Sequence, residues 1–94
     1  MDKYEDAEKY YKEALQIYNK LALKSPDAYL PSLAAIQYNL GILYNNLGKY
    51  ANAKKYYKEA LQIYMGLTEQ YADVYLSKYN SVKEKLDLLI QKGK

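Results

Sequence analysis

The sequence predicts an all-α fold of four helices, in which antiparallel helical hairpins stack into a short solenoid. The string KYYKEALQIY occurs at Lys9–Tyr18 and again at Lys55–Tyr64, an offset of 46 residues. Self-similarity at such a period indicates units that bury their apolar faces against one another. Apolar residues also recur three and four positions apart, which is helical spacing. No segment alternates apolar and polar residues for long enough to predict a strand.

Length and composition limit the class of protein. The chain has 94 residues, enough for a single small domain over 1–94, and its 50% hydrophobic and 27% charged content is that of a globular protein. It has no Cys and no His, which excludes disulfide scaffolds, thiolate chemistry and His-based metal sites. The apolar stretches are shorter than a membrane span, and no signal peptide heads the chain. We therefore expect a cytoplasmic protein with no cofactor, no bound metal and no membrane contact.

The first helix is predicted over residues 4–24. Acidic residues in its first turns suit the positive end of the helix dipole, namely Asp2, Glu5, Asp6 and Glu8. Ser25-Pro26 ends it, because proline disfavours a helical residue before it. The apolar stripe of this helix consists of Tyr4, Ala7, Tyr11, Ala14, Tyr18 and Leu21.

The second helix is predicted over residues 28–47. Asp27 is the expected N-cap, and Pro31 is tolerable near the start, where amides lack helical partners. Gly48 is expected to end the helix in a tight turn.

The third helix, over 50–70, repeats the first: Tyr4–Tyr18 and Tyr50–Tyr64 are identical at 12 of 15 positions. The fourth is predicted over 73–91, with Gly93 as its terminator. Residues 27–47 and 73–93 match at only 5 of 21 positions, and Asp87 stands where the second helix has Gly41. A polar last helix is typical of a terminal cap, so we expect this helix to be one.

The motif from Gln37 to Tyr44, which reads Gln37-x-x-Leu40-Gly41-x-x-Tyr44, is followed by Gly48-Lys49-Tyr50, Ala53, Tyr57 and Ala60. This set resembles a tetratricopeptide repeat, with the second helix as its first helix and the third as its second. The period of 46 residues exceeds the family's usual 34 and is similar to the long-repeat subclass of kinesin light chain. Gln37 stands where the family prefers Trp, and no proline follows the third helix.

The resemblance implies a right-handed solenoid that acts as a scaffold for protein–protein interaction. Its concave groove would be lined by the second and fourth helices and would bind a peptide or a partner protein. Tyr38 and Ile42 are not needed for the hairpin contact, although packing on a neighbouring helix is the alternative interpretation for both. The candidate binding residues are Ala35, Tyr38, Asn39, Ile42, Asn45, Glu84, Lys85 and Leu88.

A second hypothesis is a self-assembling module. The repeat units run over 2–47 and 48–93, so the chain begins in the middle of a family repeat. Ala53 is expected to face Gly41, but its equivalent Ala7 has no preceding helix to face. We expect a homodimer in which the first helices of two copies meet, whereas Asp87 opposes head-to-tail stacking. The candidate self-association residues are Tyr4, Ala7, Tyr11, Ala14 and Tyr18.

Other functions are not supported by the residues present. No catalytic residue is expected, because His and Cys are absent and no Gly-rich loop follows a strand. Tyr next to Lys at Lys9–Lys12 suggests base stacking and phosphate contact, but Tyr11 belongs to the apolar stripe and all 14 basic residues are Lys. We therefore expect neither an enzyme nor a nucleic-acid-binding protein.

Overall fold

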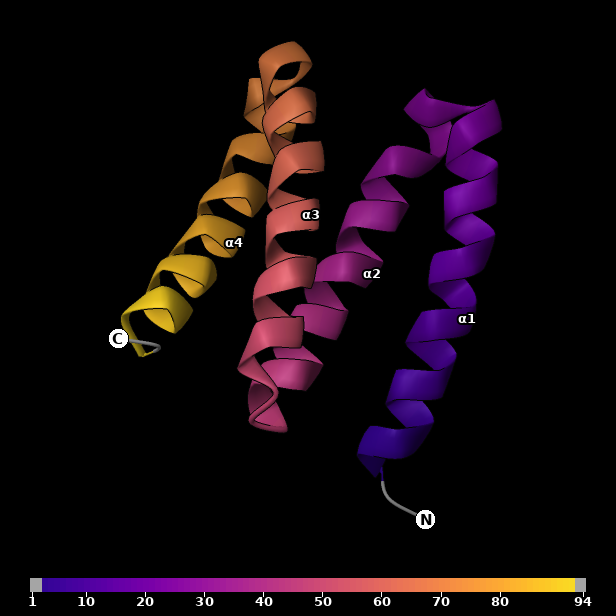
Figure 1. The fold of residues 1–94 in the computed structure, drawn as a ribbon. Coiled ribbons are helices and arrows are strands. Elements are labelled where there is room, and N and C mark those ends of the chain that lie inside the picture. The colour runs from indigo at the N-terminus through magenta and orange to yellow at the C-terminus, as the bar shows by residue number, and fades with distance from the viewer. Residues whose placement is uncertain (1–2, 93–94) are drawn as a thin grey trace.

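The computed structural model describes residues 3–92 as four helices, α1 Lys3–Lys24, α2 Pro26–Asn46, α3 Tyr50–Gln70 and α4 Ala72–Lys92. They follow one another across the molecule in chain order, with α1 and α4 at the two ends (Figure 1). The described residues contain no strand, so the all-α prediction is confirmed. Each helix end lies within two residues of the expected position. The expected roles of Asp2 and Gly93 lie outside the described residues.

The turns α1–α2 and α3–α4 each consist of one residue, Ser25 and Tyr71. The two residues are 46 positions apart and have almost the same backbone conformation, with φ −140° and ψ 76° at Ser25 and φ −136° and ψ 62° at Tyr71. Each carbonyl accepts the first amides of the next helix, those of Ala28 and Tyr29 after Ser25 and those of Val74 and Tyr75 after Tyr71. The sequence repeat is therefore also a repeat of backbone geometry.

The start of α2 differs from the expectation. Pro26 is the first helical residue and Ser25 is the N-cap, without a side-chain capping bond. The prediction of Asp27 as N-cap is therefore wrong. The fixed φ of proline suits the first helical position, so the helix begins at Pro26 and Asp27 lies inside its first turn. Pro31 consequently lies inside α2, where it leaves the carbonyl of Asp27 without its usual amide donor.

Gly48 ends α2 as expected. Its φ of 76° is left-handed, a conformation that glycine adopts without a steric penalty. The Gly48 amide donates to the Asn45 carbonyl at 3.1 Å, and the Lys49 amide donates to the Tyr44 carbonyl at 2.8 Å. These two bonds form a Schellman motif, which reverses the chain into α3.

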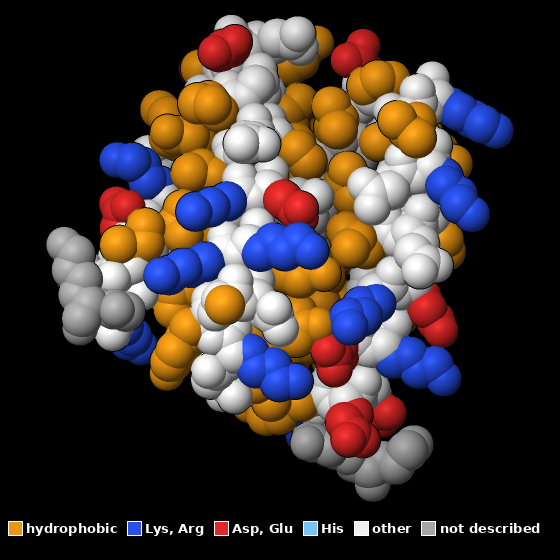
Figure 2. All heavy atoms as spheres, viewed as in Figure 1, with side chains coloured by type: hydrophobic (Ala, Val, Ile, Leu, Met, Phe, Trp, Pro, Cys, Tyr) orange, Lys and Arg blue, Asp and Glu red, His pale blue; other side chains and the backbone are white. Residues whose placement is uncertain are grey.

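The core lies where α2, α3 and α4 meet. The Tyr57 ring is fully buried and lies against Gly41, where a Cβ atom would come within 2.5 Å of the ring. Leu33, Ala34 and Gln37 of α2 are also buried. Figure 2 shows apolar side chains filling the strip between α3 and α1, with Lys side chains beside it on α3.

Residues 3–92 contain neither a candidate membrane span nor a candidate metal cluster. None of these helices combines the length and the hydropathy needed to cross a membrane. No group of three or more His, Cys, Asp or Glu side chains in this range is placed to hold a metal ion.

Candidate functional site

A groove runs between α2 and α4 over the body of α3, and we call it the α2–α4 groove. Its main hollow has a volume of about 420 Å³. A second hollow of about 270 Å³ shares Ala35, Tyr64 and Lys78 with it and extends it toward Pro31 and Val74. The main hollow is lined by Ala35, Tyr38, Asn39, Tyr64, Ser77, Lys78 and Ser81.

Tyrosine rings form the apolar part of this groove. Tyr64 is only 3% exposed and stacks on Tyr75, with ring centroids 6.3 Å apart. The ring of Tyr38 lies 5.9 Å from that of Tyr57. Burial raises the pKa of both Tyr38 and Tyr64, and the negative charge of Glu84 raises the pKa of Tyr38 further. Both phenols therefore stay neutral across the physiological range.

The rim of the groove is polar. Ser77, Lys78 and Ser81 project from α4 and are exposed, and the half-buried Asn39 faces them from α2. Hydroxyl and amide groups can donate to and accept from a peptide backbone, and Lys78 offers a positive charge. The groove thus combines an aromatic floor with hydrogen-bonding walls.

The predicted binding residues are only partly brought together. Ala35, Tyr38 and Asn39 line the α2–α4 groove, and Glu84 is near enough to Tyr38 to raise its pKa. Asn45 approaches the Tyr57 hydroxyl instead, without reaching hydrogen-bond geometry. The remaining three lie outside this lining: Ile42, Lys85 and Leu88.

Ile42 belongs to a different hollow, between α1 and α2. This hollow measures about 270 Å³ and also contains three of the predicted self-association residues. Asn39 borders both hollows. The hollow is lined by Lys3, Tyr4, Ala7, Tyr11, Asn39, Ile42, Leu43 and Asn46.

The expectation that the hairpin needs neither Tyr38 nor Ile42 is wrong. Both side chains are half-buried and pack against the core. Gly41 lets the Tyr57 ring reach the backbone of α2. Tyr38 lies about one turn before Gly41 on the same helix, so its ring contacts the Tyr57 ring there. Tyr38 therefore serves both the core and the groove.

The predicted binding residues omit four residues that line the groove: Tyr64, Ser77, Lys78 and Ser81. Sequence reasoning carried only the second half of α2 onto α4, whereas the groove also uses the first turns of both helices. The 46-residue repeat relates these positions to α2, because Ser77 and Lys78 are the equivalents of Pro31 and Ser32. Pro31 and Ser32 line the adjoining hollow.

The second candidate surface lies on α1, although Ala7 and Tyr11 of the predicted set also pack against the core beside α2. The repeat allows a direct comparison, because Ala7, Tyr11 and Ala14 correspond to Ala53, Tyr57 and Ala60. The three α3 residues are 0% exposed, whereas the three α1 residues are half-buried. Of the other two predicted residues, Tyr4 is exposed, and Tyr18 is half-buried with its ring 6.3 Å from that of Tyr29.

Two exposed apolar side chains of α1 lie beside the predicted stripe. Tyr10 is 65% exposed and Ile17 is 58% exposed. In α3 the equivalent Tyr56 and Ile63 are half-buried against the core. A hollow of about 360 Å³ follows this side of α1 and is lined by Tyr10, Glu13, Ala14, Ile17, Tyr18, Leu21 and Tyr29.

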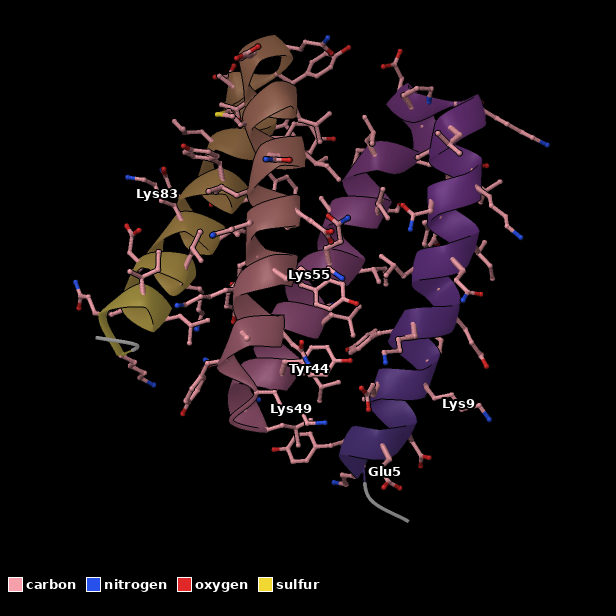
Figure 3. The ribbon with its side chains drawn as sticks, in the orientation of Figure 1. Glu5, Lys9, Tyr44, Lys49, Lys55 and Lys83 are labelled. Carbon is pink, nitrogen blue, oxygen red and sulfur yellow. The ribbon has the colours of Figure 1, made fainter. Side chains whose placement is uncertain are left out.

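A polar contact fixes α1 against α2 on its other side. The Tyr44 hydroxyl donates to a Glu8 carboxylate oxygen at 2.5 Å, and Lys12 lies 3.4 Å from the same oxygen. The bond from Tyr44 lowers the pKa of Glu8, with Lys12 adding to the shift. In Figure 3, Tyr44 lies on the side of α2 that faces α1, while Glu5 and Lys9 point away from the other helices.

Comparison with known proteins identifies one family. A family model described as tetratricopeptide repeat matches residues 1–66, more than half of the chain. Comparison with curated proteins and with solved structures gave no significant match.

Proposed function

The chain belongs to the tetratricopeptide repeat family, and on that premise we propose that it is a scaffold that binds a peptide segment of a partner protein in the α2–α4 groove. Tetratricopeptide repeats generally mediate protein–protein interactions, and the family typically consists of non-enzymatic scaffolds. The observation that carries the proposal is the groove itself, with its tyrosine floor and polar rim.

The shape of the groove favours an extended or singly turned peptide. The main and adjoining hollows share residues, so together they follow α2 and α4 from Val74 to Ser81. Aromatic floors supply contact area at low entropy cost, and the Asn39 amide can hold a peptide bond. Lys78 is the one charged side chain in the lining of the main hollow, which favours a segment with an acidic residue.

A blocked groove tests this proposal. Peptides are first selected on the wild-type chain from a random peptide library, and their affinities are measured by calorimetry. Ser77→Arg with Ser81→Arg places two large side chains at the rim without touching the core, since both serines are exposed. We expect the selected peptides to lose at least about tenfold in affinity, as when interface anchors are removed.

The matched control is Asn52→Arg with Gln62→Arg on α3, which adds the same two charges at exposed positions outside the groove lining. This control should bind as the wild type does. Selected peptides that bind the blocked variant with unchanged affinity would contradict the groove as the site.

A second candidate function is self-association through α1. The observation that favours it is the contrast between Ala53, Tyr57 and Ala60, which are fully buried, and their half-buried equivalents on α1. The exposed side of α4 carries Asn80, Glu84, Asp87 and Gln91, which are polar, beside the exposed apolar Leu76 and Leu88. We therefore propose α4 as the solvent-facing cap and α1 as the face that meets a second copy.

Sedimentation equilibrium tests this candidate. The wild type should dimerise in the micromolar range, and Ala7→Glu should weaken the dimer by placing a charge one helical turn from the exposed Tyr10. Ala51→Glu, at an exposed position of α3, is the matched control. A wild type that stays monomeric at high micromolar concentration would leave the α2–α4 groove as the one proposed surface.

A further inference from the structure

Two parallel rows of side chains follow the exposed side of α1. An apolar row has spacings of four, three and four residues, and a charged row borders it with spacings of seven, seven and four. At 3.6 residues per turn, each set stays on one side of the helix. The apolar row is Tyr10, Ala14, Ile17 and Leu21, and the charged row is Asp6, Glu13, Lys20 and Lys24.

The charged row is free to meet a partner. All four of its side chains are exposed, and none forms an ion pair with another residue of the range 3–92. The order along the chain is acid, acid, Lys, Lys. One half of the row is therefore negative and the other half is positive.

Both rows are self-complementary when a second copy of α1 runs antiparallel. Tyr10 then lies opposite Leu21 of the second copy, and the small Ala14 lies opposite its larger Ile17. In the same register, with centres that differ by about one residue around position 16, Asp6 faces Lys24 and Glu13 faces Lys20. A two-fold axis perpendicular to the helices keeps the two charged rows on the same side of the contact. The two apolar pairs and the two ion pairs can therefore form in one dimer.

We propose that a second copy of this chain docks on α1 in this antiparallel register, with opposite charges paired along one edge. The proposal rests on the self-association candidate above and specifies its orientation and its residues. The charge pattern is a property of α1 and not of the repeat, because the equivalent positions of α3 are Asn52, Glu59, Gly66 and Gln70. A parallel pair would place the charged rows on opposite edges and leave them unpaired.

A charge-exchange experiment tests the register. One variant carries Lys20→Glu and Lys24→Glu, and the other carries Asp6→Lys and Glu13→Lys. Each variant alone brings like charges together at every pair, so its dissociation constant should rise about tenfold or more at low salt. An equimolar mixture restores opposite charges across the contact, and sedimentation should then show a heterodimer of near wild-type affinity.

Lys58→Glu with Lys83→Glu is the control for the Lys20→Glu and Lys24→Glu variant, because it makes the same change of net charge at exposed positions of α3 and α4. It should dimerise as the wild type does. Circular dichroism of all variants confirms that the helices remain. Dimerisation of both α1 variants at wild-type affinity, with no preference for the mixture, would overturn the register while self-association stands. A monomeric wild type would overturn both.

Cysteine trapping gives a second measurement that does not depend on charge. The chain has no Cys, so Tyr10→Cys and Leu21→Cys introduce single thiols. In the antiparallel register, oxidation of the mixture should give the mixed disulfide. Homodimeric disulfides should be rare, because two residues at position 10 would lie about 16 Å apart along the helix. Predominant homodimeric disulfides would overturn the register.

Discussion

Single residues set the contact between α2 and α3, and Gly41 is the clearest case. Its hydrogen faces the Tyr57 ring, and a Cβ atom there would come within 2.5 Å of ring carbons. The ring cannot withdraw easily, because Tyr57 is fully buried. A glycine inside a helix usually weakens that helix. At position 41 the absence of a Cβ allows the Tyr57 ring to approach the helix closely.

We therefore expect Gly41→Ala to lower the free energy of unfolding by about 1–3 kcal/mol, and Gly41→Leu to lower it more. The matched control is Gly66→Ala in α3, where an added Cβ meets nothing within 4 Å. That change should raise stability by about 0.5–1 kcal/mol through helix propensity alone. Urea unfolding of the three variants measures both effects, and equal stability of Gly41→Ala and Gly66→Ala would contradict the contact.

The Tyr57 hydroxyl gives the molecule a dependence on alkaline pH. Burial raises the pKa of Tyr57 to about 12, with Tyr38 adding to the shift and Asn45 opposing it. An unfolded chain releases this proton near the ordinary value of 10.0, so the unfolded state gains stability as the pH rises from there. The resulting stabilisation of the fold is complete below pH 10 and is lost as the pH approaches 12.

The expected outcome is that the wild type loses stability more steeply than Tyr57→Phe above pH 10. Lysine deprotonation affects both proteins equally, so the difference between them isolates Tyr57. Urea unfolding at intervals from pH 8 to pH 11.5 measures it. Parallel curves for the two proteins would mean that the hydroxyl is solvated.

At the scale of helices, the sequence predicted the number of helices better than the residues at which they begin and end. The repeated stripe of α3 and the motif around Gly41 were sufficient for the four helices and their family. The start of α2 was missed because Pro26 both ends one helix and begins the next, and sequence reasoning used only its first role. Of the predicted binding residues, Ala35, Tyr38 and Asn39 line the α2–α4 groove, whereas the α4 side of this groove lies one or two turns before the predicted Glu84, Lys85 and Leu88.

The prediction that Tyr38 is not needed for the hairpin contact was wrong because of the size of its side chain. Helical periodicity assigns a side chain to one face, but a bulky ring at the edge of that face reaches both the core and the groove. Helical periodicity also could not predict which side of α1 is the more exposed. Tyr10 and Ile17 lie in the same repeated string as residues that α3 buries, and only the packing of α2 distinguishes the two copies.

The turn between α2 and α3 carries its own prediction. Gly48 is left-handed at φ 76°, a conformation that costs an L side chain about 1–2 kcal/mol. Gly48→Ala should therefore destabilise the protein by about that amount although nothing lies within 4 Å of the added Cβ. Comparison with Gly66→Ala by thermal melting separates backbone strain from space, and an unchanged melting temperature would contradict the Schellman turn.

At the scale of the whole molecule, α2 and α3 are each packed on two neighbours, while α1 and α4 are each packed mainly on one. In such linear stacks, stability is a sum of local and nearest-neighbour terms, so the ends open more easily than the middle. Amide hydrogen exchange should be slowest in α2 and α3 and faster in α1 and α4. Uniform protection across the four helices would indicate a single cooperative unit.

The two single-residue turns also differ in how they open, which bears on exchange of segments between molecules. At Ser25 the following Pro26 opposes a continuous helix, but Tyr71 is followed by Ala72, and no proline prevents α3 and α4 from joining into one long rod. Two molecules opened at Tyr71 would each supply α4 to the other and form a swapped dimer. Refolding at high concentration should yield this species, and Ala72→Pro, which copies Pro26, should suppress it. Gel filtration after dilution identifies the swapped dimer, because the α1 contact dissociates on dilution whereas a swapped dimer separates only by unfolding.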